Sequence, residues 1–158
     1  MQLLRSDHPT GLTPRTPAAA VFGLFRMLVG VSFAIHGLSE LYGIPVKPYG
    51  SHVAAFASWP HWWAGAIELI GGALVALGLG TRVAAVLCSG AMAYAYLTVH
   101  LHRGLLPIKN GGESAAMFCW AFFLIAVAGP GSFALAALWR WRKRSRSPAR
   151  VPSDQPHT

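Results

Sequence analysis

Ionisable side chains stand inside the apolar stretches of this sequence, where a charge is costly to bury. His36 and Glu40 lie four residues apart near the end of one apolar run, so a helix would place them on one face. Tyr96 and His100 repeat that spacing in a later run. Three further candidates stand alone within or beside such runs: Arg26, Glu68 and Glu113. Buried carboxyl and imidazole groups of this kind carry protons or bind polar ligands in other membrane proteins, so these residues form the candidate polar cluster.

No spacing in the sequence indicates that the chain is a catalyst by itself. It lacks a nucleophile–base pair, a phosphate-binding loop and a dinucleotide fingerprint. Cys88 and Cys119 have no C-x-x-C or zinc-ligand spacing, so we expect no metal site. Their expected depths in a membrane differ by about 10 Å, too far for a disulfide. His36 and His100 are expected about 6 Å apart in depth, which argues against a pair of haem ligands.

The composition is that of a membrane protein. Hydrophobic residues make up 54% of the 158 residues and charged residues only 11%, whereas a soluble domain carries about a quarter charged residues. A membrane-spanning helix needs about 20 mainly apolar residues. Four segments meet this requirement, at about 17–42, 61–79, 81–101 and 113–139. We therefore predict an all-α integral membrane four-helix bundle over residues 16–139, between polar, disordered tails at residues 1–15 and 140–158.

A Gly-Pro-Gly triplet at residues 129–131 interrupts the fourth apolar segment. Because glycine and proline break helices, we expect the membrane crossing to end there. Residues 132–144 would then form an amphipathic helix along the inner membrane surface. A single kinked helix that runs through the triplet is the alternative.

Basic residues indicate how the chain is oriented. Six of the 13 Lys and Arg residues lie between Arg140 and Arg150, directly after the last apolar segment. Such clusters stay in the cytoplasm and attract anionic lipids, so they favour a topology anchor over a nucleic-acid-binding tail. Both termini are therefore expected in the cytoplasm. This orientation places the glutamates and the histidines of the candidate cluster in the outer leaflet, with Arg26 nearer the cytoplasm.

Helices in a membrane associate through small residues and polar contacts, because lipid tails are as apolar as leucine. Gly23, Gly30 and Gly37 recur every seven residues, so we interpret them as helix-packing residues on one face of the first helix. Glu68, on the second helix, is the expected facing partner of Glu40 and His36. The polar cluster is either a clasp that fixes helix packing or a site for a proton, a quinone or another small ligand.

Three stretches carry motifs in a characteristic order: 26-RMLVGVSFAIHGLSEL-41, 68-ELIGGALVALGLGTRVAA-85 and 113-ESAAMFCWAFFLIAVAGPG-131. This order resembles the DoxX family of small four-helix bacterial membrane proteins. The matching positions are Arg26, Gly30, His36, Gly37, Glu68, Gly71, Gly72, Gly78, Thr81, Arg82, Glu113, Gly129 and Gly131. Family members often have lysine where this chain has Glu40, so the charge beside His36 is reversed here.

The resemblance implies a bacterial plasma-membrane protein with redox associations. Family members include a subunit of a thiosulfate:quinone oxidoreductase and a partner of superoxide dismutase in an oxidative-stress complex. We therefore expect a membrane subunit of a redox or oxidative-stress complex, either non-catalytic or binding a quinone or another small molecule. Its expected partners are the lipid bilayer, cytoplasmic redox or stress proteins and a second copy of the chain, but no nucleic acid. The alternatives are an anchoring or assembly protein without chemistry and a small proton-coupled transporter.

Overall fold

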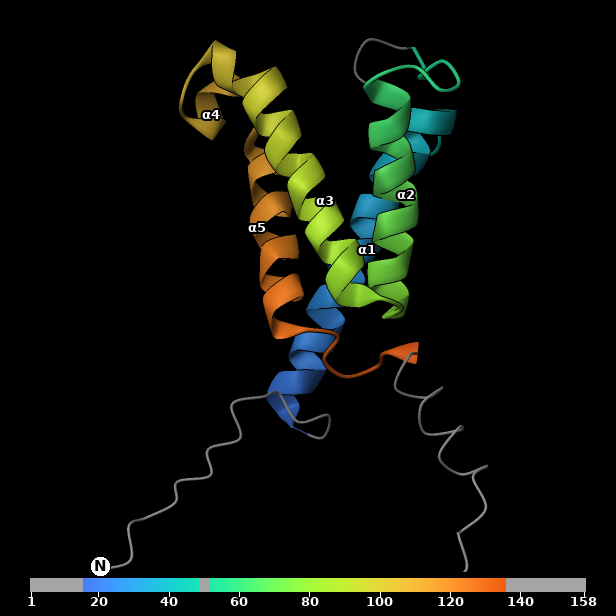
Figure 1. Ribbon diagram of the computed structural model, residues 1–158, viewed down its shortest axis with the longest axis vertical. Coiled ribbons are helices and arrows are strands. Elements are labelled where there is room, and N and C mark those ends of the chain that lie inside the picture. The colour runs from blue at the N-terminus through green and yellow to red at the C-terminus, as the bar shows by residue number, and fades with distance from the viewer. Residues whose placement is uncertain (1–15, 49–51, 136–158) are drawn as a thin grey trace, which may run out of the picture.

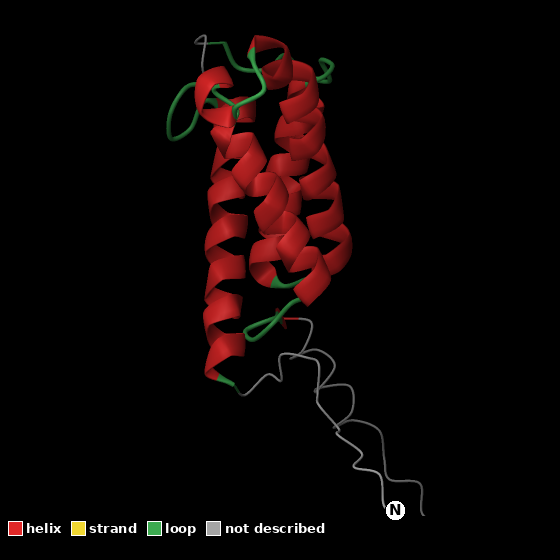
Figure 2. Ribbon diagram, turned by 90° about the vertical axis from the view of Figure 1, so that its left-hand side faces the viewer, coloured by secondary structure: helices red, strands yellow, loops and turns green. Residues whose placement is uncertain are grey.

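The computed structural model of the chain describes residues 16–48 and 52–135. Figure 1 shows helices joined by short connections, and Figure 2 distinguishes helix from loop. The longer helices are α1 (Pro17–Tyr42), α2 (His61–Leu77), α3 (Thr81–Ala95) and α5 (Glu113–Ala128). Between α3 and α5 lie a π-helical turn (Tyr96–His100), a 3-10 turn (Leu101–Arg103) and the one-turn helix α4 (Pro107–Asn110). Within the two described ranges there is no strand, so the predicted all-α class is confirmed for them.

Local sequence explains where the first two helices begin and end. At the start of α1, Thr16 Oγ1 accepts a hydrogen bond from the backbone N–H of Ala19 at 3.2 Å, and Pro17 is the first helical residue. The helix ends before Gly43, whose φ of +68° is a left-handed conformation that glycine adopts easily. α2 ends in the same way before Gly78, which has a φ of +73°.

The fourth apolar segment ends as a helix at Ala128. Gly129 has φ of +89° and ψ of −164°, a conformation that essentially only glycine adopts, and Pro130 has no N–H to continue the helix. The prediction that the helix ends at the Gly-Pro-Gly triplet is confirmed, and the kinked-helix alternative is wrong. Most of the expected amphipathic helix at 132–144, and both predicted tails, lie outside the described residues.

Two helical segments are long and apolar enough to cross a membrane: Pro17–Tyr42, with 26 residues, and Thr81–Arg103, with 23 residues. α2 has 17 residues and α5 has 16, which gives lengths of about 25 Å and 24 Å. Both are apolar, and Gly78 and Gly129 end them before the apolar composition ends. α2 is two residues shorter than predicted, whereas α5 ends at the triplet as predicted.

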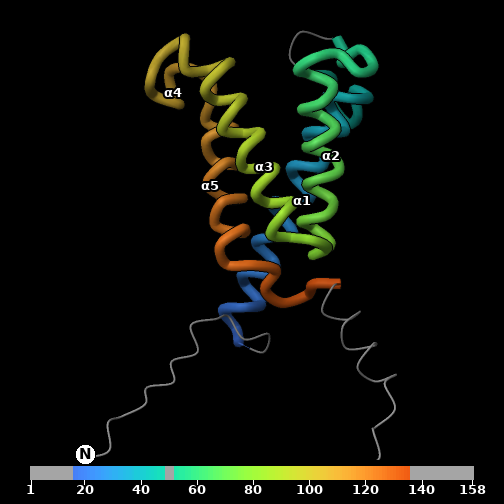
Figure 3. Tube along the Cα trace, viewed as in Figure 1, coloured from blue at the N-terminus to red at the C-terminus, as the bar shows by residue number. Residues whose placement is uncertain are grey.

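The helices pack as two pairs. α1 lies along α2, α3 lies along α5, and a short turn joins α2 to α3. The two pairs lie close together near that turn and are farther apart where the chain carries α4, as Figures 1 and 3 show. We call residues 78–82 and 129–135 the turn end, and residues 43–48, 52–60 and 96–112 the α4 end.

Glycines allow the backbones of α1 and α2 to touch. A Cβ atom added at Gly30 would lie 2.5 Å from the backbone nitrogen of Ala76, and one at Gly37 would lie 2.5 Å from the carbonyl oxygen of Gly65. Side chains at these positions would push the helices apart. The predicted packing role of these glycines is confirmed.

The apolar core lies where the two pairs meet. Its fully buried side chains include Phe33, Val75, Cys88, Phe122 and Ile125. The rings of Phe33 and Phe122 pack with their centroids 4.6 Å apart. Other large apolar side chains point away from this core, and those of Val83 and Met117 are 69% and 73% exposed. An outer surface of this kind suits contact with lipid.

Candidate functional site

Arg26 is fully buried at the turn end. Its Nη1 donates hydrogen bonds to the carbonyl oxygens of Val75 and Ala76, the second at 2.8 Å. Its Nη2 donates to the carbonyl oxygens of Ser132 at 3.4 Å and Phe133 at 3.2 Å. The last carbonyls of a helix lack partners within it and carry partial negative charge, so a guanidinium suits the end of α2. Arg26 therefore fastens α1 to the end of α2 and to the segment after α5.

Two glycines make room for this arrangement. A Cβ atom at Gly78 would lie 3.1 Å from Arg26 Nη1 and 2.7 Å from the Cα of Ala134. One at Gly23 would lie 2.6 Å from the carbonyl oxygen of Ser132. The segment after α5 therefore lies directly against α1 and α2. The sequence analysis grouped Arg26 with the acidic residues, but among the described residues its hydrogen bonds all go to backbone carbonyls.

A second arginine contacts the Gly-Pro-Gly triplet at the same end. A Cβ atom at Gly129 would lie 3.2 Å from Nη2 and 3.3 Å from Nε of Arg82, so this side chain packs on the backbone after α5. Thr81, which precedes Arg82 and is the first residue of α3, is buried. Arg26, the Thr81–Arg82 pair and the triplet thus meet at the turn end, although they are far apart along the chain.

Glu68 and Glu40 lie at the contact between α1 and α2. The Oε2 atom of Glu68 is buried and has no hydrogen-bond partner among the described residues. Glu40 is close enough to interact with Glu68 electrostatically, and Glu68 interacts in the same way with the buried Cys88 of α3. A buried carboxyl oxygen without a donor is costly, so this group is suited to hold a proton or to meet a ligand.

Glycines also bring these two acids together. A Cβ atom at Gly37 would lie 2.9 Å from the Cβ of Glu68, and one at Gly65 would lie 3.2 Å from the Cβ of Glu40. Each acid therefore stands against the bare backbone of the opposite helix. The structure places Glu68 beside Glu40, as the sequence led us to expect.

His36 is directed toward α5. Its side chain is exposed, and its ring packs edge-on against Phe118 with centroids 5.6 Å apart and planes at 82°. His36 and Glu40 share one face of α1, but the ring contact of His36 is with a different helix. His36 therefore lies between the two helix pairs.

Tyr96 and His100 belong to a separate network at the α4 end. The Tyr96 hydroxyl donates a hydrogen bond to the carbonyl oxygen of Leu105 at 2.8 Å and accepts one from Asn110 Nδ2 at 3.3 Å. Nδ1 of His100 lies 3.2 Å from the carbonyl oxygen of Asn110. These bonds hold the connection before α5 against the π-helical turn.

Asn110 organises this network, and the sequence analysis did not identify it. Its side chain donates to the carbonyl oxygen of Gly104 and accepts from the N–H of Gly112, both at 2.7 Å, and the residue is only 3% exposed. An asparagine that binds the backbone two residues later, in an Asn-Gly-Gly sequence, is typical of a tight turn. The Asn-Gly-Gly sequence is therefore the signal from which the role of Asn110 could have been predicted.

Glu113 stands apart from the other candidates. It is exposed in the first turn of α5, where a carboxylate complements the partial positive charge of a helix N-terminus. Within residues 16–48 and 52–135, no group of three or more His, Cys, Asp or Glu residues could hold a metal ion. The predicted cluster is thus divided into the Arg26 site, the Glu68 site with Glu40, His36 against Phe118, the network of Tyr96 and His100, and Glu113.

The two cysteines lie at more similar depths along the helix axes than predicted. Ser89 Oγ donates a hydrogen bond to the carbonyl oxygen of Cys119 at 2.9 Å, and Cys88 is the neighbour of Ser89. The expected depth difference of about 10 Å is wrong, because it assumed that both helices extend across a full bilayer core. Both cysteines are free thiols, and Cys88 packs against Gly71 of α2.

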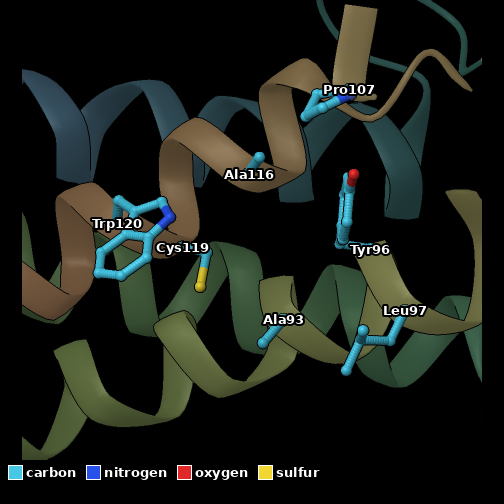
Figure 4. Close-up of a pocket in the computed structure, with 7 residues that line it drawn as sticks. All are labelled: Ala93, Tyr96, Leu97, Pro107, Ala116, Cys119 and Trp120. Atoms are coloured by element: carbon cyan, nitrogen blue, oxygen red, sulfur yellow. The ribbon is translucent and has the colours of Figure 1, made fainter. Parts of the chain in front are cut away.

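A pocket of about 340 Å³ lies between α3 and α5 near the α4 end. Figure 4 shows the side chains of its wall. The side toward α3 and the π-helical turn consists of Ala93, Tyr96 and Leu97, and the side toward α5 of Ala116, Cys119 and Trp120. Pro107 of α4 contributes the remaining part. The wall contains no charged side chain.

Comparison with known proteins supplies a family. The family model named DoxX matches residues 16–101. An uncharacterized protein of Haemophilus influenzae is 37% identical over 113 residues, which cover 70% of this chain and 84% of the relative. The protein of Bacillus subtilis named "Putative oxidoreductase CatD" is 39% identical over 114 residues, which cover 71% of this chain and 81% of the relative. The comparison with solved structures gives no match.

Proposed function

Because the chain belongs to the DoxX family of membrane proteins, we propose that it is a plasma-membrane subunit of a redox or oxidative-stress complex whose Glu68 carboxyl binds a quinone or a similar small molecule. The name of the Bacillus relative supports a redox role. In this proposal the helices cross the membrane as a four-helix bundle with both termini in the cytoplasm, where redox or stress proteins bind. The basic residues that follow Trp139 support that orientation.

The unpartnered Oε2 atom of Glu68 is the observation that carries this proposal. A carboxyl group donates a hydrogen bond when it is protonated and accepts one when it is ionised. It can therefore bind the carbonyl oxygen of a quinone and also the hydroxyl group of the corresponding quinol. A ligand that makes this bond removes the cost of the unsatisfied oxygen.

The surroundings of Glu68 fit an organic ligand better than a metal ion. Glu40 adds a second carboxyl group at the same helix contact. His36, which precedes Gly37 at that contact, carries a ring that packs against Phe118 of α5. Two carboxyl groups without a third ligand make an incomplete metal site. A flat, partly apolar molecule with polar oxygens matches these groups in chemistry.

The test compares Glu68→Gln with Glu113→Gln in the full-length protein. Glutamine keeps the size of the side chain but cannot exchange a proton. We expect quinone that co-purifies in mild detergent, measured by mass spectrometry, to fall about tenfold in Glu68→Gln, because the neutral amide makes a weaker hydrogen bond than a carboxyl group that can ionise, by about 1.4 kcal/mol. Tolerance of cells to oxidants should fall in parallel. Glu113→Gln is the matched control and should change neither quantity.

Two results would contradict the proposal. One is purified wild-type protein that carries no quinone, together with full oxidant tolerance in cells that carry Glu68→Gln. That combination would favour an anchoring or assembly role without chemistry. The other is quinone that is retained equally by both variants, which would move the binding site away from Glu68.

A further inference from the structure

The pocket between α3 and α5 is separate from the site at Glu68. Its wall belongs to α3, the π-helical turn, α4 and α5, whereas Glu68 lies on α2 against α1. Small side chains leave the space open, since Ala93 and Ala116 contribute to opposite sides of the wall. The π-helical turn begins at Tyr96, on that wall, and such turns inside helices are frequent at functional sites.

Two of the polar side-chain atoms of the wall are already engaged. The hydroxyl group of Tyr96 is bonded to Leu105 and Asn110. The sulfur of Cys119 lies 3.6 Å from Ser89 Oγ. The remaining wall is aliphatic or aromatic, and the indole N–H of Trp120 is its remaining side-chain donor. The pocket therefore offers mainly contacts to an apolar chain.

The rim of the pocket faces outward. Leu97 is 59% exposed and Trp120 is 70% exposed, and exposed apolar side chains of a membrane protein contact lipid tails. Lys109 is exposed and lies two positions after Pro107 in the one-turn helix α4, so its long side chain starts near the pocket but from another side of α4. An apolar cavity that opens to lipid near a cation is complementary to a molecule with an apolar chain and an anionic head.

We propose that this pocket binds one acyl chain of an anionic phospholipid whose headgroup phosphate pairs with Lys109. A volume of about 340 Å³ accommodates part of one chain and leaves the rest of the lipid in the bilayer. The position of Lys109 at the α4 end, where the apolar helices stop, suits a phosphate at the membrane surface. The bound lipid would wedge α3 and α5 at a fixed separation near the π-helical turn.

The experiment is native mass spectrometry of the delipidated full-length protein after incubation with equal amounts of phosphatidylglycerol and phosphatidylcholine of matched chains. Wild type should retain one phosphatidylglycerol molecule and prefer it at least fivefold over phosphatidylcholine, about 1 kcal/mol for one basic residue near the surface. Ala116→Phe, which fills the pocket, should lower retention of both lipids about tenfold. Val127→Phe adds the same ring to an exposed position of α5 outside the pocket and should retain lipid as wild type does.

Charge variants separate the headgroup from the chain. Lys109→Gln should remove the preference for phosphatidylglycerol but keep retention of phosphatidylcholine, whereas Lys47→Gln, an exposed lysine elsewhere at the α4 end, should keep the preference. Thermal unfolding in detergent checks that each variant is folded, and Ala93→Leu replaces Ala116→Phe if the latter is not.

Equal lipid retention by Ala116→Phe, Ala93→Leu and wild type would overturn the proposal, since it would indicate lipid bound only around the outer surface. An unchanged headgroup preference in Lys109→Gln would overturn the assigned phosphate contact. Retention of a neutral quinone in this pocket, in preference to either phospholipid, would overturn the assigned ligand. None of these outcomes depends on Glu68, so the proposed function is tested separately.

Discussion

Arg26 at the turn end and Glu68 at the α1–α2 contact are both ionisable residues among apolar helices, but their surroundings differ. The two Nη atoms of Arg26 donate to carbonyl oxygens from two separate segments, and only its Nε is buried without a partner among the described residues. Oε2 of Glu68 has no partner among the described residues. A buried polar group with partners holds a fold together, whereas one without partners lowers stability until something binds it. The difference identifies Arg26 as structural and Glu68 as the candidate binding group.

The largest effect on stability should come from Arg26→Leu. The substitution removes the guanidinium donor from the carbonyl oxygens of Ala76 and Phe133 and one of the two donors of Val75, whose carbonyl also accepts from the N–H of Gly78. The free energy of unfolding should therefore fall by about 3–5 kcal/mol. Unfolding of the purified protein in detergent by added denaturing detergent measures this loss. Arg26→Lys, which keeps the charge but not the forked geometry, should fall between wild type and Arg26→Leu. Wild-type stability of Arg26→Leu would contradict a structural role.

Gly37→Leu should have the next largest effect, because it separates α1 from α2 where the two acids meet. A side chain there collides with the backbone of α2 near Gly65, and overpacking of this kind costs about 1–3 kcal/mol. The same unfolding measurement applies. Gly90→Ala is the matched control, since no atom lies within 4 Å of the added Cβ atom, and it should be neutral or slightly stabilising. Equal stability of both variants would contradict the close packing of α1 on α2.

Asn110→Ala should lower stability by about 1–2 kcal/mol, because it removes the side-chain bonds to Gly104 and Gly112 and the donor to Tyr96. The loss should be confined to the α4 end. Hydrogen exchange measured by mass spectrometry should increase in residues 104–112 and stay unchanged at the turn end. A uniform increase along the chain would mean that this network supports the whole fold rather than one connection.

Glu68→Gln should change stability least, by less than about 1 kcal/mol in either direction, since a carboxyl oxygen without a partner contributes little to the fold. Its effect should appear in ligand retention instead. Arg26→Leu and Glu68→Gln should therefore both be measured for stability and for ligand retention, because this separates a structural role from a binding role. A loss of several kcal/mol in Glu68→Gln would show that Glu68 is a structural clasp and would remove the difference between the two residues.

Features that depend on neighbouring residues could be predicted from the sequence. The seven-residue spacing of Gly30 and Gly37 gave the packing face of α1, and the Gly-Pro-Gly triplet gave the end of α5. The placement of Glu68 opposite Glu40 followed from the expected antiparallel order of the first two helices. Each of these predictions rests on helical periodicity or on the conformations that glycine and proline allow.

Features that depend on the level of one helix relative to another could not be predicted in this way. Arg26 precedes Glu40 by 14 residues, which places them on nearly the same face but about 21 Å apart along the axis. Periodicity does not say that the carbonyl of Ser132 will lie beside Arg26. The level of Cys119 beside Ser89 was missed for the same reason. The π-helical turn and the role of Asn110 depend on contacts between the α4 connection and α3, which no repeat in the sequence records.

The hydrogen bonds of Arg26 can form only in a certain order while the chain is synthesised. Ser132 follows Arg26 by 106 residues, so the first helix leaves the ribosome long before the segment that supplies half of the acceptors of its guanidinium. Until that segment arrives, Arg26 is without the Ser132 and Phe133 carbonyls, and only the end of α2 is available to it. A chain that stops before residue 132 would therefore lack both acceptors of Arg26 Nη2. A segment that is made about 106 residues later thus completes the contacts of the first helix.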